Sequence, residues 1–457
     1  MPVAVWWIRR DLRLTDNFAL QAARQSGYPV LPVFIMDNHL MAGPVNRRQR
    51  FLVNALNDLR AQLQQEGSDL LVRRGEPTEV LSALFKEMGA VGVYAEEDYS
   101  PYAVNRDATV SRAVPLTLTP GLTIHPPDAV LKPDGSPYTI FTPYSRKWLS
   151  LPTPFLASNA SGNFLPAQQF PASGPLPDMD PVEGFTATHD EAESRLALFL
   201  SLRVDDYASH RDRMDLNGTS GLSPYLRFGL LSAARLSVLI RQQAATLPEG
   251  PRVWLNELIW RDIYQSILHH FPYVTREAFQ AKFRHITWRD APADLRAWKD
   301  GLTGYPVVDA AMRQLKSTGW MHNRARMITA SFLTKDLLIN WQEGEHWFMD
   351  QLVDGDTAAN NGGWQWAAGT GTDAAPYFRI FNPVLQGKRF DPLGAYIRRW
   401  VPELRHLPDD YIHEPWTIPP LEQVSLGLVI GRDYPSPLVD HSQVRDRTLA
   451  AYRVSAG

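Results

Sequence analysis

The sequence predicts a Rossmann-like α/β domain with an open parallel sheet, joined by a long linker to an all-helical domain. Three observations support this division. Apolar runs alternate with amphipathic segments over the first third of the chain, a proline-rich stretch with few charges follows, and helical periodicity dominates from residue 191 onward. Strands that alternate with helices favour a parallel sheet covered on both faces. We expect the boundaries 1–130, 131–190 and 191–457.

The predicted sheet begins with a continuous apolar run, as a strand buried on both faces should. Four strands are expected, over Val3–Ile8, Val30–Met36, Leu70–Arg73 and Val91–Ala95. Between them apolar residues recur every three or four positions, which is typical of amphipathic helices. These helices are expected over Phe18–Gln25, Arg47–Gln65 and Thr78–Met88, the last with Thr78 as its cap. No G-x-G-x-x-G motif follows the first strand, so the usual dinucleotide-binding turn is missing.

The linker is marked by its composition. Residues 151–185 contain seven prolines, and their only charges are Asp178, Asp180 and Glu183. We expect this stretch to wrap over a surface or to be partly disordered. After it, helices are expected over Glu191–Leu202, Pro224–Arg241, Val253–His270, Val307–Leu315, Arg324–Leu338 and Gly344–Leu352. A helical domain of roughly 260 residues is large for one core, but a cofactor could fill its centre.

The composition excludes several classes of protein. There is no cysteine, which excludes disulfides, thiolate metal sites, iron–sulfur clusters and a cysteine nucleophile. The chain has 46 basic and 49 acidic residues. It is therefore no histone-like polycation, although a local basic face can still bind phosphates. We find no signal peptide and no uncharged apolar run near about 18 residues, so we expect a soluble, cytoplasmic protein without a membrane span.

Two polar segments are candidate binding sites. In Asn217–Pro224, hydroxyls and glycines precede a helix that Ser223 would cap and Pro224 would begin. Such a helix start suits a phosphate or pyrophosphate, although an ordinary capped helix has the same pattern. The segment Asp354–Trp366 has acids, amides and glycines ahead of two tryptophans. It is either a ligand-binding loop or a turn with packed aromatic rings.

Two helical segments carry a second kind of candidate. Glu257 and Trp260 lie three residues apart and share a helix face. An acid beside a flat ring suits a base-recognising pocket, and the alternative is an exposed acid next to a core tryptophan. Asn323 and Met327 also share a face. The arginines between them, Arg324 and Arg326, point elsewhere, and one of them could pair with Asp354; the alternative is a solvated basic surface.

The remaining clusters of charged residues and histidines indicate a function less specifically. A cluster of five cations with only one acid among them favours a phosphate-binding face, and a solvated face is the alternative. The five cations are Arg379, Lys388, Arg389, Arg398 and Arg399. His269 and His270 are adjacent and lack the spacing of metal ligands, and no H-E-x-x-H motif occurs. We therefore expect no metal.

Together these motifs resemble the photolyase/cryptochrome family, and more narrowly the class I cyclobutane pyrimidine dimer (CPD) photolyases. The resemblance runs from Trp6–Asn17 to the basic region past Arg399 and is most specific over Thr303–Asn382. It implies a deoxyribodipyrimidine photo-lyase, a light-driven carbon–carbon lyase in DNA repair. Light-excited, reduced anionic FAD would pass an electron to a flipped-out dimer and split it. The implied partner is DNA that contains CPDs, and a monomer is expected.

The resemblance also assigns residues to the cofactor. The positions that hold the FAD phosphates are matched by Tyr207, Thr219, Ser220, Leu222 and Ser223. Arg326 and Asp354 match an ion pair over the flavin, and Asp356 matches an acid near the ribityl chain and ring edge. Asn360 matches the residue that faces flavin N5. Plant photoreceptors of the family carry an aspartate there, so the amide favours repair over signalling.

Further residues are assigned to the lesion, to electron transfer and to DNA. The dimer pocket is matched by Glu257, Trp260, Asn323, Met327 and Trp366. The tryptophan chain that carries electrons from the surface to oxidised flavin is matched by Trp364, Trp341 and Trp288. Contacts to the DNA backbone are matched by Arg211, Arg261, Arg324 and Arg379. The 6-4 photoproduct enzymes place histidines around the lesion, and Asn323 and Met327 argue against that substrate.

Several alternatives stay open at this point. The chain could be a cryptochrome-type light sensor, a DASH-type protein that repairs mainly single-stranded DNA, or a flavin-free nucleic-acid-binding module. The antenna chromophore of the first domain is a second open question. The segment Glu96–Tyr102, followed by Arg106 and Asp107, partly resembles deazaflavin-type members. Folate and second-flavin antennas also occur in the family, so the identity of any antenna and its residues stay unassigned.

Overall fold

The structure is a computed structural model that describes residues 2–158, 162–242 and 247–456. The chain forms two compact units. Unit 1 comprises Met1–Asp205 and Ser220–Pro272, and unit 2 comprises Asp206–Thr219 and Tyr273–Gly457. The units thus group the first helices after the linker with the α/β part of the chain. The domain boundaries 1–130, 131–190 and 191–457 stay a prediction.

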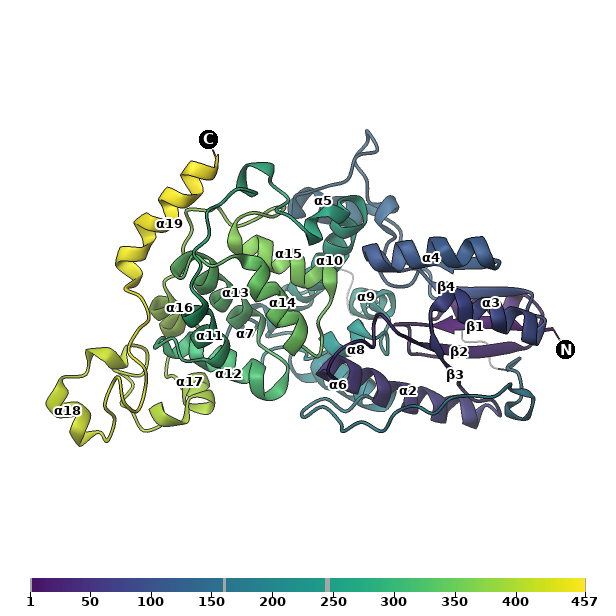
Figure 1. Ribbon diagram of the computed structural model, residues 1–457, viewed down its shortest axis with the longest axis horizontal. Coiled ribbons are helices and arrows are strands. Elements are labelled where there is room, and N and C mark those ends of the chain that lie inside the picture. The colour runs from purple at the N-terminus through teal and green to yellow at the C-terminus, as the bar shows by residue number, and fades with distance from the viewer. Residues whose placement is uncertain (1, 159–161, 243–246, 457) are drawn as a thin grey trace. The chain divides into compact units, whose positions relative to one another are not determined.

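Unit 1 is built on a five-stranded parallel sheet with the order β3-β2-β1-β4-β5 (Figure 1). Its strands are β1 (Ala4–Ile8), β2 (Val30–Asp37), β3 (Leu71–Gly75), β4 (Gly92–Glu96) and β5 (Leu116–Thr119). The four predicted strands are confirmed, and all residues of β1 and β2 are buried. The edge strand β5 escaped prediction because it is only four residues long and largely exposed, so it has no continuous apolar run.

Helices cover both sides of this sheet, with α2 and α4 on opposite sides in the view of Figure 1. Before the proline-rich stretch 151–185 the helices are α1 (Phe18–Gln25), α2 (Arg47–Gln65), α3 (Pro77–Met88), α4 (Pro101–Ala113), η1 (Pro127–Ala129) and α5 (Phe141–Ser150). The predicted bounds of α1 and α2 are confirmed. Thr78 as the cap of α3 was wrong, because Pro77 already begins the helix and Glu76 is the capping position without a side-chain hydrogen bond.

After the linker, unit 1 contains four more helices. They are α6 (His189–Leu202), α8 (Ser223–Arg227), α9 (Ala233–Gln242) and α10 (Glu249–His270). The single helix predicted over 224–241 was wrong. Gly229 breaks it, because its φ of +67° is left-handed and a Cβ at this position would collide with the Arg10 carbonyl. Ser223 as a cap was also wrong, since it is the first residue of α8 and Leu222 is the capping position.

The described part of the proline-rich stretch 151–185 lies along the rest of unit 1 in ordered contacts. Its longest regular element is the short 3₁₀ helix η2 (Ala167–Gln169). Ser68 Oγ donates to the Leu165 carbonyl (2.7 Å), and Asn54 Nδ2 donates to the Met179 carbonyl (3.2 Å). The backbone of Val72 donates to Ser173 Oγ (3.0 Å). The prediction of a surface-wrapping segment therefore holds for 151–158 and 162–185, while 159–161 lie outside the described residues.

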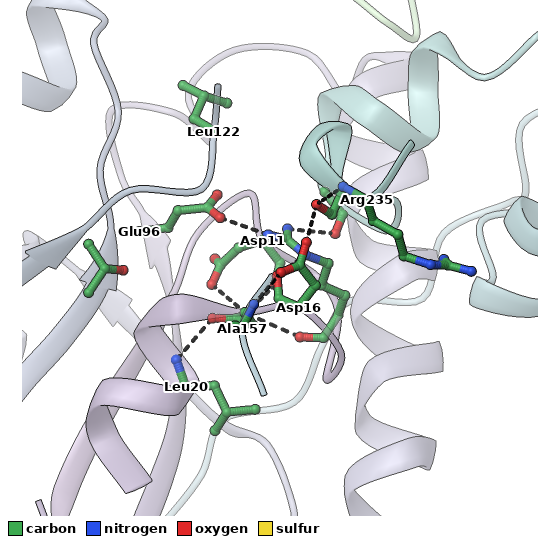
Figure 2. Close-up of polar contacts among 12 residues, drawn as sticks. Asp11, Asp16, Leu20, Glu96, Leu122, Ala157 and Arg235 are labelled. Carbon is green, nitrogen blue, oxygen red and sulfur yellow. Dashed lines mark hydrogen bonds and ion pairs between the residues drawn. The ribbon is translucent and has the colours of Figure 1, made fainter. Parts of the chain in front are cut away.

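A buried polar network fastens the turn after β1 to its surroundings in unit 1 (Figure 2). Arg13 pairs with Glu96 at the end of β4 (Nη2–Oε1 2.9 Å), and both side chains are only 3% exposed. Asp11 accepts hydrogen bonds from Trp6 Nε1 (3.2 Å) and Asn17 Nδ2 (3.0 Å). Paired charges at this depth fix the geometry of the turn, because each would be costly alone.

The regular elements of unit 2, among its described residues, are helices, apart from an isolated β-bridge between Ile430 and Tyr434. Its α-helices are α7 (Tyr207–His210), α11 (Pro292–Asp300), α12 (Pro306–Thr318), α13 (Asn323–Ser331), α14 (Trp341–Gln351), α15 (Thr357–Ala368), α16 (Pro383–Phe390), α17 (Ala395–Trp400), α18 (Pro420–Ser425) and α19 (His441–Ala456). Shorter turns are η3 (Pro272–Thr275, which begins at the last residue of unit 1), η4 (Ala281–Phe283), η6 (Pro402–Leu404) and η7 (Pro415–Thr417). A π-helical turn, η5 (Phe332–Asp336), follows α13 and corrects the uniform helix predicted over 324–338.

The Asp354–Trp366 segment corrects the expectation of a loop. Most of it is the helix α15, which Asp356 caps by accepting hydrogen bonds from the backbones of Ala358 (3.0 Å) and Ala359 (3.2 Å). Only the three residues before Thr357 are outside the helix. The polar residues of the segment are therefore displayed with helical spacing. Across the described residues, no helix is long and apolar enough to cross a membrane.

Candidate functional site

The first candidate group joins α13 to the start of α15 within unit 2. Arg326 Nη2 pairs with Asp354 Oδ2 (2.8 Å), which confirms that one of the two arginines meets Asp354. Arg326 Nε also donates to the Met321 carbonyl (2.9 Å), so the guanidinium is held from two sides. The Asp354 side chain is only 3% exposed, and its Oδ1 has no hydrogen-bond partner among the described residues. A buried, unpartnered acceptor fits a site whose ligand supplies the donor.

Asn360 lies one turn into α15, next to α14. Its Nδ2 donates to the backbone carbonyl of Glu345 (3.0 Å), which fixes the orientation of the amide. This side chain is partly exposed, and that hydrogen bond does not use its carbonyl oxygen. A neutral amide held in this way can hydrogen-bond a ligand atom without bringing a negative charge to it.

Glu345 belongs to a supporting network that the sequence did not reveal. Its Oε1 accepts a hydrogen bond from Asn361 Nδ2 (2.9 Å), and Asn361 Oδ1 accepts one from Gln365 Nε2 (3.1 Å). Both amides also donate to the Val274 carbonyl (2.9 Å each). Burial raises the pKa of Glu345 from its usual 4.5 to about 7. A buried acid on an amphipathic helix leaves no local sequence signal, because the same residue type is usually exposed.

This raised pKa makes stability depend on pH. The unfolded chain loses the Glu345 proton near pH 4.5 and the folded chain near pH 7, so stability falls as pH rises through this window. We expect Glu345→Gln to remove the fall, which amounts to ~3 kcal/mol at pH 8. Urea unfolding at pH 5 and pH 8 measures it. The exposed Glu343→Gln on the same helix is the control, and equal pH dependence in Glu345→Gln and wild type would refute the assignment.

The three tryptophans of the predicted electron chain share the core of unit 2. Trp364 and Trp341 are 2% and 3% exposed, and Trp288 is partly exposed and packs against the same cluster. Trp364 contacts Phe348 edge-on, with ring centroids 4.9 Å apart. Its Nε1 is buried without a hydrogen-bond partner among the described residues. Two of the three are therefore buried and Trp288 reaches the surface, and their role in electron transfer stays a prediction.

The residues predicted for the lesion fall into two sets, one in each unit. In unit 2, Asn323 is exposed and its Nδ2 lies 3.9 Å from Met327 Sδ, which confirms their shared face, and Trp366 packs against the core cluster. In unit 1, Glu257 and Trp260 are partly exposed on α10. Trp260 stacks on Phe141 with ring centroids 4.0 Å apart and planes 4° apart. The sequence had not indicated Phe141 as a neighbour of this site.

The residues predicted for the FAD phosphates are divided between the two units along the chain. Tyr207 is 7% exposed on α7, and Thr219 is partly exposed at the end of its segment. In unit 1, Ser220 and Ser223 are partly exposed, and Leu222 is buried. Between Ser220 and Leu222, Gly221 has a φ of +64°, a conformation that favours glycine. Their role as phosphate ligands stays a prediction.

The four arginines predicted to contact DNA differ in how firmly they are held. Arg324 Nη2 pairs with Asp212 (2.7 Å), and its guanidinium lies 4.3 Å from the Phe390 ring centroid. Arg261 donates to the Leu122 carbonyl and lies 4.0 Å from Asp262. Arg211 lies over the Tyr207 ring, 5.6 Å from its centroid. Arg379 is exposed on the segment before α16, so it is the best placed of the four to reach a phosphate.

Comparison with known proteins places this fold and these residues in a family. The chain is 42% identical to a deoxyribodipyrimidine photo-lyase of Escherichia coli strain K12, over all of this chain and 99% of the relative. The chain belongs to the DNA photolyase family. A family model of DNA photolyase matches residues 4–161, and a model of the FAD binding domain of DNA photolyase matches residues 254–454. The predicted photolyase fold, a parallel α/β domain followed by a helical FAD-binding domain, is thereby confirmed.

Solved photolyase-family structures agree with this assignment. A bacterial class III photolyase from Agrobacterium tumefaciens superposes with a TM-score of 0.93 at 36% identity, covering 100% of this chain and 98% of that one. A cryptochrome from Synechocystis superposes with a TM-score of 0.89 at 28% identity, covering 99% of both chains. The fold is therefore shared by a photolyase and a cryptochrome, and the choice between these two kinds of protein depends on individual residues.

Proposed function

We propose that this photolyase-family member is a deoxyribodipyrimidine photo-lyase, which splits CPDs in DNA with light energy. The full-length similarity to the E. coli enzyme of that name carries the proposal. The FAD cofactor fits residues of unit 2, where Asp354 keeps a buried, unpartnered oxygen next to the Arg326 ion pair. When bound and reduced, FAD supplies the light-excited electron that opens the cyclobutane ring.

The protein's own residues bind and orient the cofactor. The phosphate contacts come from Tyr207, Thr219, Ser220, Leu222 and Ser223. Arg326, Asp354 and Asp356 hold the remainder of the cofactor, with Arg326 and Asp354 fixed by their mutual ion pair. Asn360 offers a neutral amide toward flavin N5, which avoids repulsion with an anionic ring and supports repair rather than signalling. Its fixed orientation, from the hydrogen bond to the Glu345 carbonyl, supports this role.

The residues assigned to the lesion are Glu257 and Trp260 of unit 1 and Asn323, Met327 and Trp366 of unit 2. The aromatic rings give the flipped dimer apolar walls and exclude water, and Phe141 stiffens Trp260 by stacking on it. Glu257 hydrogen-bonds a pyrimidine edge and stabilises the dimer radical anion. A flipped CPD costs less than a flipped normal pair, because crosslinked pyrimidines stack and pair poorly.

Replacement of Glu257 by alanine tests this pocket. We expect repair per absorbed photon to fall by about tenfold, because a hydrogen bond to a charged group is worth roughly 1.5–3 kcal/mol. FAD should stay bound, which the flavin absorbance of the purified variant measures. Glu257→Gln, which keeps a hydrogen-bonding group, should lose less. An unchanged repair yield in Glu257→Ala would exclude the role.

DNA binds through phosphate contacts near the lesion, made by Arg211, Arg261, Arg324 and Arg379, of which Arg379 is the most exposed. We propose further that the protein is a cytoplasmic monomer. A folate or deazaflavin antenna stays an unassigned addition, which the absorbance spectrum of the purified protein would reveal.

The direct test is repair of an oligonucleotide that contains one thymine CPD. Reduced protein is incubated with it under blue light and in the dark. Repair only in the light is the expected result. A flavin-containing protein without light-dependent repair would instead favour a photoreceptor, the alternative suggested by the similarity to the Synechocystis cryptochrome.

A further inference from the structure

Three metal-binding side chains meet in unit 1, at the C-terminal end of α10. His269 Nε2 lies 3.6 Å and His270 Nε2 lies 3.7 Å from the same oxygen, Asp128 Oδ1. The three ligand atoms all lie within 4.8 Å of one another. From the sequence alone we expected no metal, because the adjacent His269 and His270 lack the spacing of metal ligands and Asp128, on η1, is far from them along the chain. None of the three takes part in the proposed repair site.

Buried contacts hold the η1 segment against α10. The Asp262 carboxylate, 0% exposed, accepts hydrogen bonds from the backbones of Ile124 (3.1 Å) and His125 (3.2 Å) and from Trp148 Nε1 (2.9 Å). The residue before it, Arg261, donates to the Leu122 carbonyl. The approach of Asp128 to the last turn of α10 is therefore set by a rigid scaffold, as a preorganised ligand site requires.

The donor set and its spacing suit a divalent transition metal. Two imidazole nitrogens and a carboxylate oxygen are ligands of Zn²⁺ and of its neighbours in the first transition row. Tetrahedral Zn²⁺ with ligands at ~2.0–2.2 Å has its ligand atoms about 3.4 Å apart. The two observed oxygen–nitrogen separations, 3.6 and 3.7 Å, are close to this value. His269 is 31% exposed, so its ring has room to rotate toward His270.

We propose that Asp128, His269 and His270 form a binding site for Zn²⁺ or a similar divalent transition-metal ion, which clasps the η1 segment to the end of α10. Three protein ligands leave one position of a tetrahedral ion for water. The site is separate from the cofactor and the lesion residues, so this inference does not depend on the proposed repair activity.

The state of the two histidines agrees with this role. His270 Nε2 is buried and has no hydrogen-bond partner among the described residues, so its lone pair is available to a metal. His270 also interacts with the backbone of Pro127, and since proline has no N–H, the acceptor is its carbonyl. Metal-binding histidines commonly have such a carbonyl partner.

Calorimetric titration of ZnCl₂ into tag-free, EDTA-dialysed protein tests the site. We expect one saturable Zn²⁺ site per chain in the wild type. Asp128→Asn should weaken its affinity by about tenfold or more, since loss of even an outer-shell partner costs about 10–100-fold. Asp128 is 72% exposed, so this variant should fold normally. His269→Gln is a second variant, with the same expected loss.

Thermal unfolding provides an independent readout. At the same Zn²⁺ concentration, the ion should raise the unfolding temperature of the wild type more than that of Asp128→Asn, because the folded variant binds the ion more weakly. His406→Gln and Asp410→Asn, which change an exposed histidine and an exposed aspartate elsewhere, should bind Zn²⁺ like the wild type. The proposal is overturned if the wild type shows no saturable binding, or if Asp128→Asn and His269→Gln bind as tightly as the wild type.

Discussion

Replacement of Trp364 by phenylalanine is expected to slow light-driven reduction of the oxidised flavin by about tenfold or more, equivalent to ~1.4 kcal/mol or more in barrier. Repair by chemically pre-reduced protein should be unaffected. Trp364 is the first member of the predicted chain of three tryptophans, of which Trp364 and Trp341 are buried and Trp288 is partly exposed. Phenylalanine keeps an aromatic ring in the core but gives up an electron far less readily than an indole. The two activities should therefore separate.

The measurement follows flavin absorbance under blue light with an external reductant present, and repair is measured separately after chemical reduction. Trp298→Phe is the matched control, because Trp298 is fully buried and only 6.0 Å from Trp364 between ring centroids but lies outside the predicted chain. It should retain photoreduction. If Trp364→Phe lost both activities, Trp364 would support the cofactor site rather than transfer electrons.

The parts of the fold that the sequence predicted are those with strong local periodicity. The buried strands β1 and β2 and the helices α1 and α2 fall in this class. The helix α15 could not be predicted in this way, because its Asn-Asn-Gly-Gly stretch has low helix propensity. Tertiary contacts stabilise it instead, through the hydrogen bonds of Asn361 and Gln365 to the Val274 carbonyl. Such contacts depend on a segment remote in sequence, which local patterns cannot indicate.

The candidate site shows the same limit. The sequence could say that either Arg324 or Arg326 pairs with Asp354, but the choice depends on Asp212, which occupies Arg324. The raised pKa of Glu345 and the approach of Asp128 to His269 depend likewise on burial and on long-range packing. Residue types at motif positions are readable from one sequence. Their partners and their electrostatic surroundings need the fold.

The second large effect is expected from Glu96→Ala, which should lower the free energy of unfolding by about 3–5 kcal/mol, out of a typical total of roughly 5–15 kcal/mol. The substitution leaves the buried Arg13 guanidinium with two backbone acceptors, the carbonyls of Asp16 (3.0 Å) and Gly229 (3.1 Å), and without its bonded carboxylate. The negative charges of Asp11 and Asp16 still act on it, but a buried charge that has lost its direct partner is far more costly than an exposed one.

Urea unfolding of the full chain, followed by a probe of unit 1, measures this loss. Glu87→Ala is the matched control, because the Arg73–Glu87 pair is 28% and 47% exposed and such surface pairs contribute ~0.2–1 kcal/mol. A double variant, Arg13→Met with Glu96→Leu, should be more stable than Glu96→Ala, since it removes both charges and keeps the volume. If Glu96→Ala unfolded at the same urea concentration as Glu87→Ala, the buried pair would not be what fixes the turn after β1 to β4.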